Sequence, residues 1–197
     1  MVTRSSDSRG RLIIAVVAGV VAACAVTRPA VHAQSTTTFV PVTDATLQEP
    51  SPADWLMWRR TLDGWGYSPL DQIDRTNVGD LRLVWSRALH TPGRQQGTPL
   101  VYDGVMYMPN PSDVIQAIDA VTGDLIWEYR RSLPDDVCEF LIPGVCTTNR
   151  NLAIYDNLII DTSVDDYVFA LDATTGDLVW ETQILDYRVH PANQSSG

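Results

Sequence analysis

Two segments of this chain are nearly identical and lie 53 residues apart. Residues 117–128 read AIDAVTGDLIWE, and residues 170–181 read ALDATTGDLVWE. The match continues upstream at the same offset, because residues 100–107 (LVYDGVMY) align with residues 153–160 (AIYDNLII). A repeat of this length indicates a supersecondary unit present more than once, so the fold must place such units side by side.

Each copy contains four short apolar runs separated by turn signals. The first turn is Asp103-Gly104 in one copy and Asp156-Asn157 in the other, and the last turn is Thr-Gly-Asp in both. Four short strands joined by tight turns predict an all-β fold, a β-propeller built from four-stranded blades. A degenerate copy at residues 77–85 (NVGDLRLVW) predicts that another blade begins or ends near residue 85, giving about three blades in total.

The conserved chemistry of the two copies predicts how neighbouring blades dock. The glycine of each Thr-Gly turn, Gly123 or Gly176, can take a positive φ, and the Asp ahead of it can accept backbone N–H groups. The Trp that ends each copy can pack against the neighbouring blade while its indole N–H finds a carbonyl. We therefore interpret Trp85, Trp127 and Trp180 as docking residues rather than ligands.

Residues 1–33 have the pattern of a signal peptide. Arginines precede the apolar run 12–26, and residues 31–33 (VHA) form a small-x-small cleavage site. A competing interpretation is a lipobox that ends at Cys24, which would then carry a lipid anchor. We favour soluble export over the lipoprotein, and either route leads to the periplasm of a bacterial host. Residues 34–53, rich in Thr, Pro and small polar side chains, predict a mobile leader.

The charge of the chain argues against a nucleic-acid partner. The sequence has 14 Arg, no Lys and 24 acidic residues, with a formal charge of −10. Removal of residues 1–33 takes away four Arg and one Asp, so the charge becomes −10 − 4 + 1 = −13. Such an acidic surface repels a phosphate backbone, so we expect no binding to nucleic acid.

Two cysteines, Cys138 and Cys146, remain after export. An oxidising compartment favours a local disulfide, although spacing alone does not bring the two Cα atoms within about 7 Å, and two free thiols are the alternative. The absence of a neighbouring His argues against a zinc site. The dense aromatic residues of segment 54–67 predict a rigid segment packed across the end of a sheet.

The segment from residue 54 to the end of the chain resembles quinoprotein alcohol dehydrogenases. The resemblance is carried by residues 54–73 (DWLMWRRTLDGWGYSPLDQI), by residues 77–81 (NVGDL) and by the two Trp-ended repeats. It implies that residues 54–197 are the amino-terminal part of an eight-bladed propeller holding pyrroloquinoline quinone (PQQ) beside a calcium or lanthanide ion. The implied reaction is oxidation of a small alcohol to an aldehyde by hydride transfer to the quinone. Electrons would then pass to cytochrome c or another acceptor.

The resemblance also implies cofactor-binding residues. Arg150, in residues 149–153, matches a family Arg that approaches the quinone oxygens, and its planar donors suit that role. Gln96 occupies the place of a family Glu that contacts the cofactor carboxylate. Ser195 corresponds to a family Thr or Ser that contacts the cofactor. The adjacent Cys pair of many members has no counterpart, because Gly144-Val145 stands there.

The resemblance places the metal ligands and the catalytic Asp beyond residue 197. We therefore expect no catalytic or metal-binding residue in this sequence, which resembles a truncated reading frame and should be inactive by itself. Non-catalytic propellers share the same repeats, so the alternative is a periplasmic binding or assembly scaffold that never binds the quinone.

Overall fold

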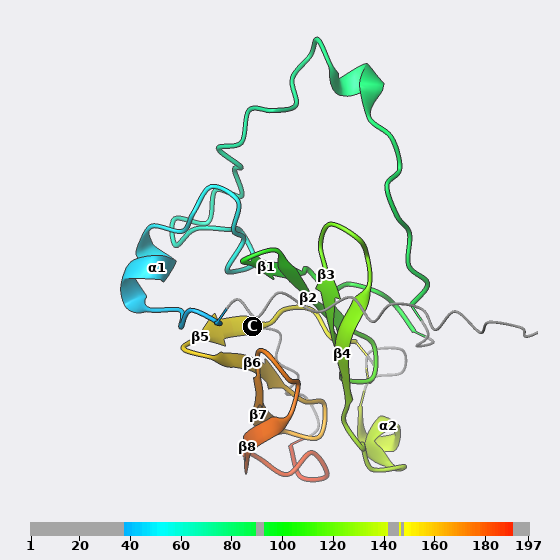
Figure 1. The fold of residues 1–197 in the computed structure, drawn as a ribbon. Helices are drawn as coiled ribbons and strands as arrows, with labels where there is room; N and C mark the ends of the chain where they lie inside the picture. Colours follow the sequence, from blue (N-terminus) through cyan, green and yellow to red (C-terminus); the bar gives the residue numbers. More distant parts are fainter. Residues whose placement is uncertain (1–37, 90–92, 142–145, 147, 191–197) are drawn as a thin grey trace, which may run out of the picture. The chain divides into compact units, whose positions relative to one another are not determined.

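The computed structural model describes residues 38–89, 93–141, 146 and 148–190. In these residues the strands form two four-stranded antiparallel sheets, and each sheet keeps its strands in sequence order (Figure 1). The strands of the first sheet are β1 (Leu100–Tyr102), β2 (Val105–Asn110), β3 (Val114–Asp119) and β4 (Leu125–Arg130). Those of the second are β5 (Ala153–Tyr155), β6 (Leu158–Thr162), β7 (Tyr167–Asp172) and β8 (Leu178–Gln183).

Three short helical segments accompany the sheets. They are α1 (Asp44–Gln48), the 3₁₀ turn η1 (Val78–Asp80) and α2 (Val137–Phe140). No helix within the described part of the chain has the length and apolar character needed to cross a membrane.

The sequence repeat is reproduced in the pairing of the strands. In the first sheet Val105 pairs with Asp119, and the residues 53 positions later, Leu158 and Asp172, pair in the second. The register between the last two strands shifts directly after Ala117 in one sheet and at the equivalent position in the other. The predicted repeat of four-stranded antiparallel units is therefore confirmed.

The described residues contain two complete sheets, against the expectation of about three blades for the chain. Residues 81–89, which include the end of the degenerate copy at Trp85, contain no strand. Trp85 nevertheless docks on the first sheet, where its indole Nε1 donates to the carbonyl of Ala120 at 3.1 Å. The copy thus keeps its docking residue without forming a sheet of its own.

The Thr-Gly turn receives the Trp of the preceding copy. Trp127 donates from Nε1 to the carbonyl of Ala173 at 3.0 Å, and its ring lies against Gly176. A Cβ added at Gly176 would be 2.6 Å from the indole, and φ there is +78°, so both space and backbone require glycine. Asp172 supports the turn by accepting the N–H groups of Thr174 and Thr175. The predicted turn chemistry and blade docking are confirmed for this pair.

The main core extends across both sheets. Tyr107 and Phe169 are its largest fully buried side chains, and Tyr107 also donates its hydroxyl to the Ala173 carbonyl at 3.2 Å. Because alternate residues of a strand face opposite sides, β3 and β7 each direct two apolar side chains into this core. The buried members are Val42, Leu56, Leu100, Tyr102, Tyr107, Ile115, Ala117, Trp127, Leu152, Ile154, Ile159, Phe169, Leu171 and Ala173.

Part of the segment predicted as a mobile leader is folded. Residues 1–37, which include the proposed signal peptide, Cys24 and the start of the leader, lie outside the described residues. Val42 is buried and exchanges two backbone hydrogen bonds with Asp156, each 2.8 Å long. Thr43 begins α1 with a reciprocal capping box to Thr46. Composition suggested a flexible segment, but residues 38–53 are held by several contacts beyond Val42, among them the hydrogen bond from the Tyr102 hydroxyl to the Val40 carbonyl and the packing of Phe39 against Tyr102.

The aromatic segment after the leader packs only at its start. Trp55 exchanges backbone hydrogen bonds with Val101 on β1, and Leu56 enters the core. Trp58, Trp65 and Tyr67 are more than half exposed, so the expectation that the whole segment packs across a sheet end is not met.

Candidate functional site

One end of the two sheets carries the residues that the family resemblance singled out. In an antiparallel sheet successive connections alternate between opposite ends. The β2–β3 loop, the β6–β7 loop and the long β4–β5 connection therefore share one end, while the Trp-docking turns occupy the other. Arg150 ends the β4–β5 connection and Gln96 precedes β1, so both residues lie at the first end.

Arg150 and Gln96 are in direct contact, although 54 residues separate them in sequence. The Nε of Arg150 donates to Gln96 Oε1 at 3.0 Å. The carbonyl of Arg150 also accepts the backbone N–H of Thr98 at 2.7 Å, which holds the two loops together. Within the described ranges, no carboxylate forms an ion pair with Arg150. The terminal nitrogens of its guanidinium are therefore available to an external oxygen acceptor.

Asn149 precedes Arg150 in the chain and is linked to Asp161 on β6. Asn149 is buried and donates from Nδ2 to Asp161 Oδ2 at 2.6 Å. Burial raises the pKa of Asp161 to about 8, the negative charge of Asp113 adds to the rise, and the hydrogen bonds from Asn149 and Thr162 oppose it. The pKa of this carboxyl therefore lies well above the ordinary range for Asp.

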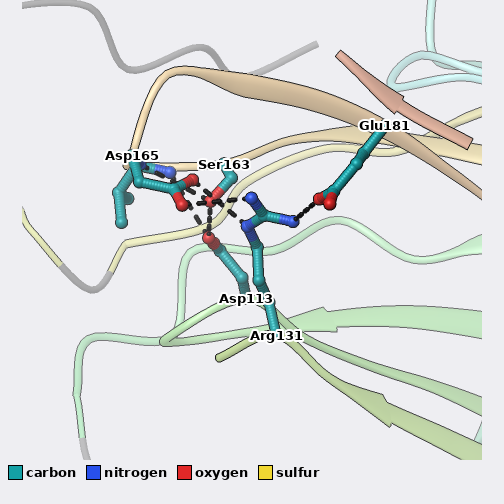
Figure 2. A network of polar contacts seen from close by, with 6 residues as sticks. Asp113, Arg131, Ser163, Asp165 and Glu181 are labelled. Atoms are coloured by element: carbon teal, nitrogen blue, oxygen red, sulfur yellow. Dashed lines mark hydrogen bonds and ion pairs between the residues drawn. The ribbon is translucent and has the colours of Figure 1, made fainter. Parts of the chain in front are cut away.

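The two sheets are joined by a network of polar side chains that sequence reasoning did not find. Figure 2 shows the guanidinium of Arg131 between Asp165 and Glu181. Arg131 donates to both carboxylate oxygens of Asp165, at 3.0 and 3.1 Å, and to Glu181 at 2.7 Å. Its side chain is only 8% exposed and stacks at 4.7 Å over the ring of Tyr167. Arg131 follows β4 in the first sheet, so this contact spans the sheet boundary.

A buried carboxylate from the β2–β3 loop completes the network. Asp113 accepts the Ser163 hydroxyl at 2.6 Å and the backbone N–H of Val164 at 3.3 Å (Figure 2). Burial raises the pKa of Asp113 to about 6 against these two hydrogen bonds. The repeat contained a signal that could have drawn attention to this loop, because the position 53 residues after Asp113 is also an Asp, Asp166. In the structure both aspartates have a positive φ.

The disulfide site lies in the β4–β5 connection. The structure joins Cys138 and Cys146 by a disulfide bond, with the two Cα atoms 5.2 Å apart. Cys146 packs in a second, smaller core with Val137, Leu141, Val164 and Tyr187. Tyr187 follows β8 and donates its hydroxyl to Asp136 at 2.7 Å. The bridged loop is thereby held to the second sheet.

Ser195 lies outside the described residues. Across the part of the chain that the structure describes, no group of three or more His, Cys, Asp or Glu side chains is arranged to hold a metal ion.

Comparison with known proteins gives a consistent result. Residues 55–182 match the β-propeller domain family of PQQ glucose, ethanol and alcohol dehydrogenases. The chain is 40% identical over 146 residues to the dehydrogenase subunit of a quinone-dependent alcohol dehydrogenase from Gluconacetobacter polyoxogenes. That match covers 74% of this chain and 19% of the relative.

Two solved structures resemble the fold. A quinohaemoprotein alcohol dehydrogenase from Pseudomonas putida superimposes with a TM-score of 0.69 at 34% identity, covering 75% of this chain and 22% of the other. A europium-containing methanol dehydrogenase gives 0.65 at 29% identity, covering 72% and 25%. The chain thus spans about a fifth of the length of the curated relatives it matches. Its repeat, its blade topology and the family match over most of its length lead to one conclusion: this chain belongs to the PQQ-dependent glucose, ethanol and alcohol dehydrogenase β-propeller family.

Proposed function

We propose that this chain forms part of the cofactor-binding face of a PQQ-dependent alcohol dehydrogenase. The observation that carries the proposal is the contact between Arg150 and Gln96, which joins two residues expected at the cofactor from separate segments. Membership of the oxidoreductase family supports it.

The chemistry of the donor set fits an anionic quinone. Arg150 holds Gln96 through Nε and keeps its two terminal nitrogens for an oxygen acceptor. Gln96 uses its carbonyl oxygen on Arg150, so its amide N–H groups remain to donate to a carboxylate. PQQ, when bound, supplies the two-electron oxidant for conversion of an alcohol to an aldehyde. Arg150 would stabilise negative charge on the oxygens that it contacts.

The same proposal includes an electron acceptor, a metal ion beside the cofactor and a periplasmic location. The quinohaemoprotein nature of the P. putida relative supports electron transfer to cytochrome c or another acceptor. The europium-containing relative supports a metal ion, calcium or a lanthanide, beside the cofactor. The signal-like residues 1–33 support export to the periplasm, with soluble export favoured over a lipid anchor at Cys24.

Binding of PQQ to the chain tests the proposal. We expect titration with PQQ to quench tryptophan fluorescence, and Arg150→Ala to weaken binding about tenfold or more, because a charge-assisted hydrogen bond is lost. Arg75→Ala is the matched control, since Arg75 is an exposed arginine remote from the site in sequence. We expect the chain with PQQ and calcium to reduce no electron-acceptor dye, since the resemblance assigns the role of catalytic Asp to no residue of this sequence.

Two results would count against this function. Equal affinity in the wild type, Arg150→Ala and Arg75→Ala would show that PQQ does not meet Arg150. Failure of the folded wild-type chain to bind PQQ at all would favour the non-catalytic scaffold.

A further inference from the structure

The backbone beside Arg150 is fixed by a buried hydrogen bond between Asn149 and Asp161. Its neighbour Asn149 is 3% exposed and reaches into the second sheet, where Nδ2 donates to Asp161 Oδ2 at 2.6 Å. Asp161 lies on β6 and is 4% exposed, and its second oxygen accepts the N–H of Thr162 at 2.8 Å. The backbone next to Arg150 is therefore fixed to the middle of a sheet.

Arg150 itself is bound by the segment that precedes β1, through Gln96 and Thr98. Its carbonyl accepts the N–H of Thr98, and its Nε donates to Gln96. A long side chain such as Arg loses up to about 2 kcal/mol of rotamer entropy when it is ordered. Ordering the guanidinium before a ligand arrives removes that loss from the binding step.

The surroundings of Asp161 make its interaction with Asn149 sensitive to charge. Of the residues that the structure describes, no Arg or His donates a hydrogen bond to Asp161. The titratable group that acts on it is Asp113, which in turn faces Asp165 and Arg131. An ionised Asp161 would be a buried charge with amide partners only, which is unfavourable.

We propose that Asn149 and Asp161 are positioning residues, and that their buried hydrogen bond fixes the direction in which Arg150 presents its guanidinium to the cofactor. This inference rests on the proposed function for the identity of the ligand. Asn149 and Asp161 act through Arg150 and touch no ligand themselves.

The direct test observes Arg150 without cofactor. The ¹⁵N–¹H correlation signal of its Nε–H group reports the hydrogen bond to Gln96, and Arg150→Lys identifies the signal by removing it. We expect Asn149→Ala and Asp161→Ala to shift and broaden this signal. Asp161→Asn keeps one oxygen acceptor for Asn149, although its NH2 group replaces the oxygen that accepts the Thr162 N–H, and it should leave the signal closer to wild type than Asp161→Ala does. Asn151→Ala is the matched control, because Asn151 flanks Arg150 on the other side and its side chain has no hydrogen bond in the described structure.

Two further readouts separate positioning from general stability. The affinity for PQQ should fall about fivefold or more in Asn149→Ala and stay near wild type in Asp161→Asn and Asn151→Ala. Between about pH 7 and 9 the Arg150 signal should move in the wild type but not in Asp161→Asn, because the pKa of Asp161 is raised to about 8.

The outcomes are distinguishable. An unchanged Arg150 signal in folded Asn149→Ala, or the same pH profile in the wild type and Asp161→Asn, would overturn the positioning role. If the wild-type chain binds no PQQ but the Arg150 signal responds as expected, the proposed function fails and the positioning of Arg150 stands.

Discussion

Arg131 is the residue that links the charges of the two sheets. Burial by itself lowers the pKa of Arg131, but the hydrogen bonds to Asp165 and Glu181 outweigh that effect and raise it. Both Arg131 and Asp165 are less than a tenth exposed, so each requires the other. Loss of one partner would leave the other as an uncompensated buried charge.

We therefore expect Arg131→Ala to lower the free energy of unfolding by about 3–5 kcal/mol, as measured by urea denaturation. The adjacent Arg130 provides the control. Its ion pair with Glu128 is half exposed on the Arg side, so Arg130→Ala should have a much smaller effect. Equal losses in the two variants would mean that burial of Arg131 does not strengthen its ion pairs.

Contacts of individual residues were predictable from the sequence only where a matching segment marks the residue. Arg150 and Gln96 were singled out through the family resemblance, because each lies in a short segment that matches the family, and the structure brings the two side chains into contact. Arg131 and Asp161 were missed, because their partners lie in another loop or another sheet and no local spacing encodes the contact. The β2–β3 and β6–β7 loops appeared only as polar stretches, although each contains an Asp at the same repeat position.

The turns and strands were predicted more completely than the side-chain network. Every strand of both sheets and both Thr-Gly turns coincide with the apolar runs and turn signals of the repeat, which are local properties. Residues 38–53 were predicted poorly, because their order depends on a free strand edge that composition does not reveal.

The docking turn can be tested with two glycines of nearly equal φ. Gly176 has φ +78° and a Trp127 ring 2.6 Å from the site of its missing Cβ, whereas Gly104 has φ +77° and open space. Gly104→Ala should lose only the roughly 1–2 kcal/mol of a left-handed backbone. Gly176→Ala should lose about 1–3 kcal/mol more, because the indole must move.

Urea unfolding measures both losses, and tryptophan fluorescence reports the displacement of Trp127. If the two glycine variants lost the same stability, the ring contact at Gly176 would have no energetic importance.

For the molecule as a whole, buried carboxyls set the dependence of stability on pH. Asp113 and Asp161 have pKa values of about 6 and about 8 in the folded chain, both above the ordinary value of 3.8. Between pH 4 and 8 the folded state keeps protons that the unfolded state releases. The free energy of unfolding therefore falls as pH rises through this window, by up to about 1.4 kcal/mol per pH unit for each group.

The turn residue Asp119 changes the free energy of unfolding in the opposite direction, but at a pH below this window. Hydrogen bonds from the backbone of Thr122 and Val121 lower the pKa of Asp119, so its contribution is lost only as pH falls below the ordinary range. We expect urea denaturation from pH 4.5 to 8.5 to show declining stability in the wild type and a smaller decline in Asp161→Asn. Stability that stays level or increases with pH would contradict this expectation.

The docking of Trp127 on the turn at Ala173 has a consequence for how such a chain can grow. Each copy of the repeat carries both halves of the contact, a tryptophan at its end and a receiving turn within it. A tandem duplication of the coding segment would therefore add a unit that already fits its neighbour, with no new interface to evolve. Because the β4–β5 connection lies at the opposite end, it can lengthen and diversify independently of that fit. Ancestral expansion and later specialisation of the loops could thus proceed at separate places in the same gene.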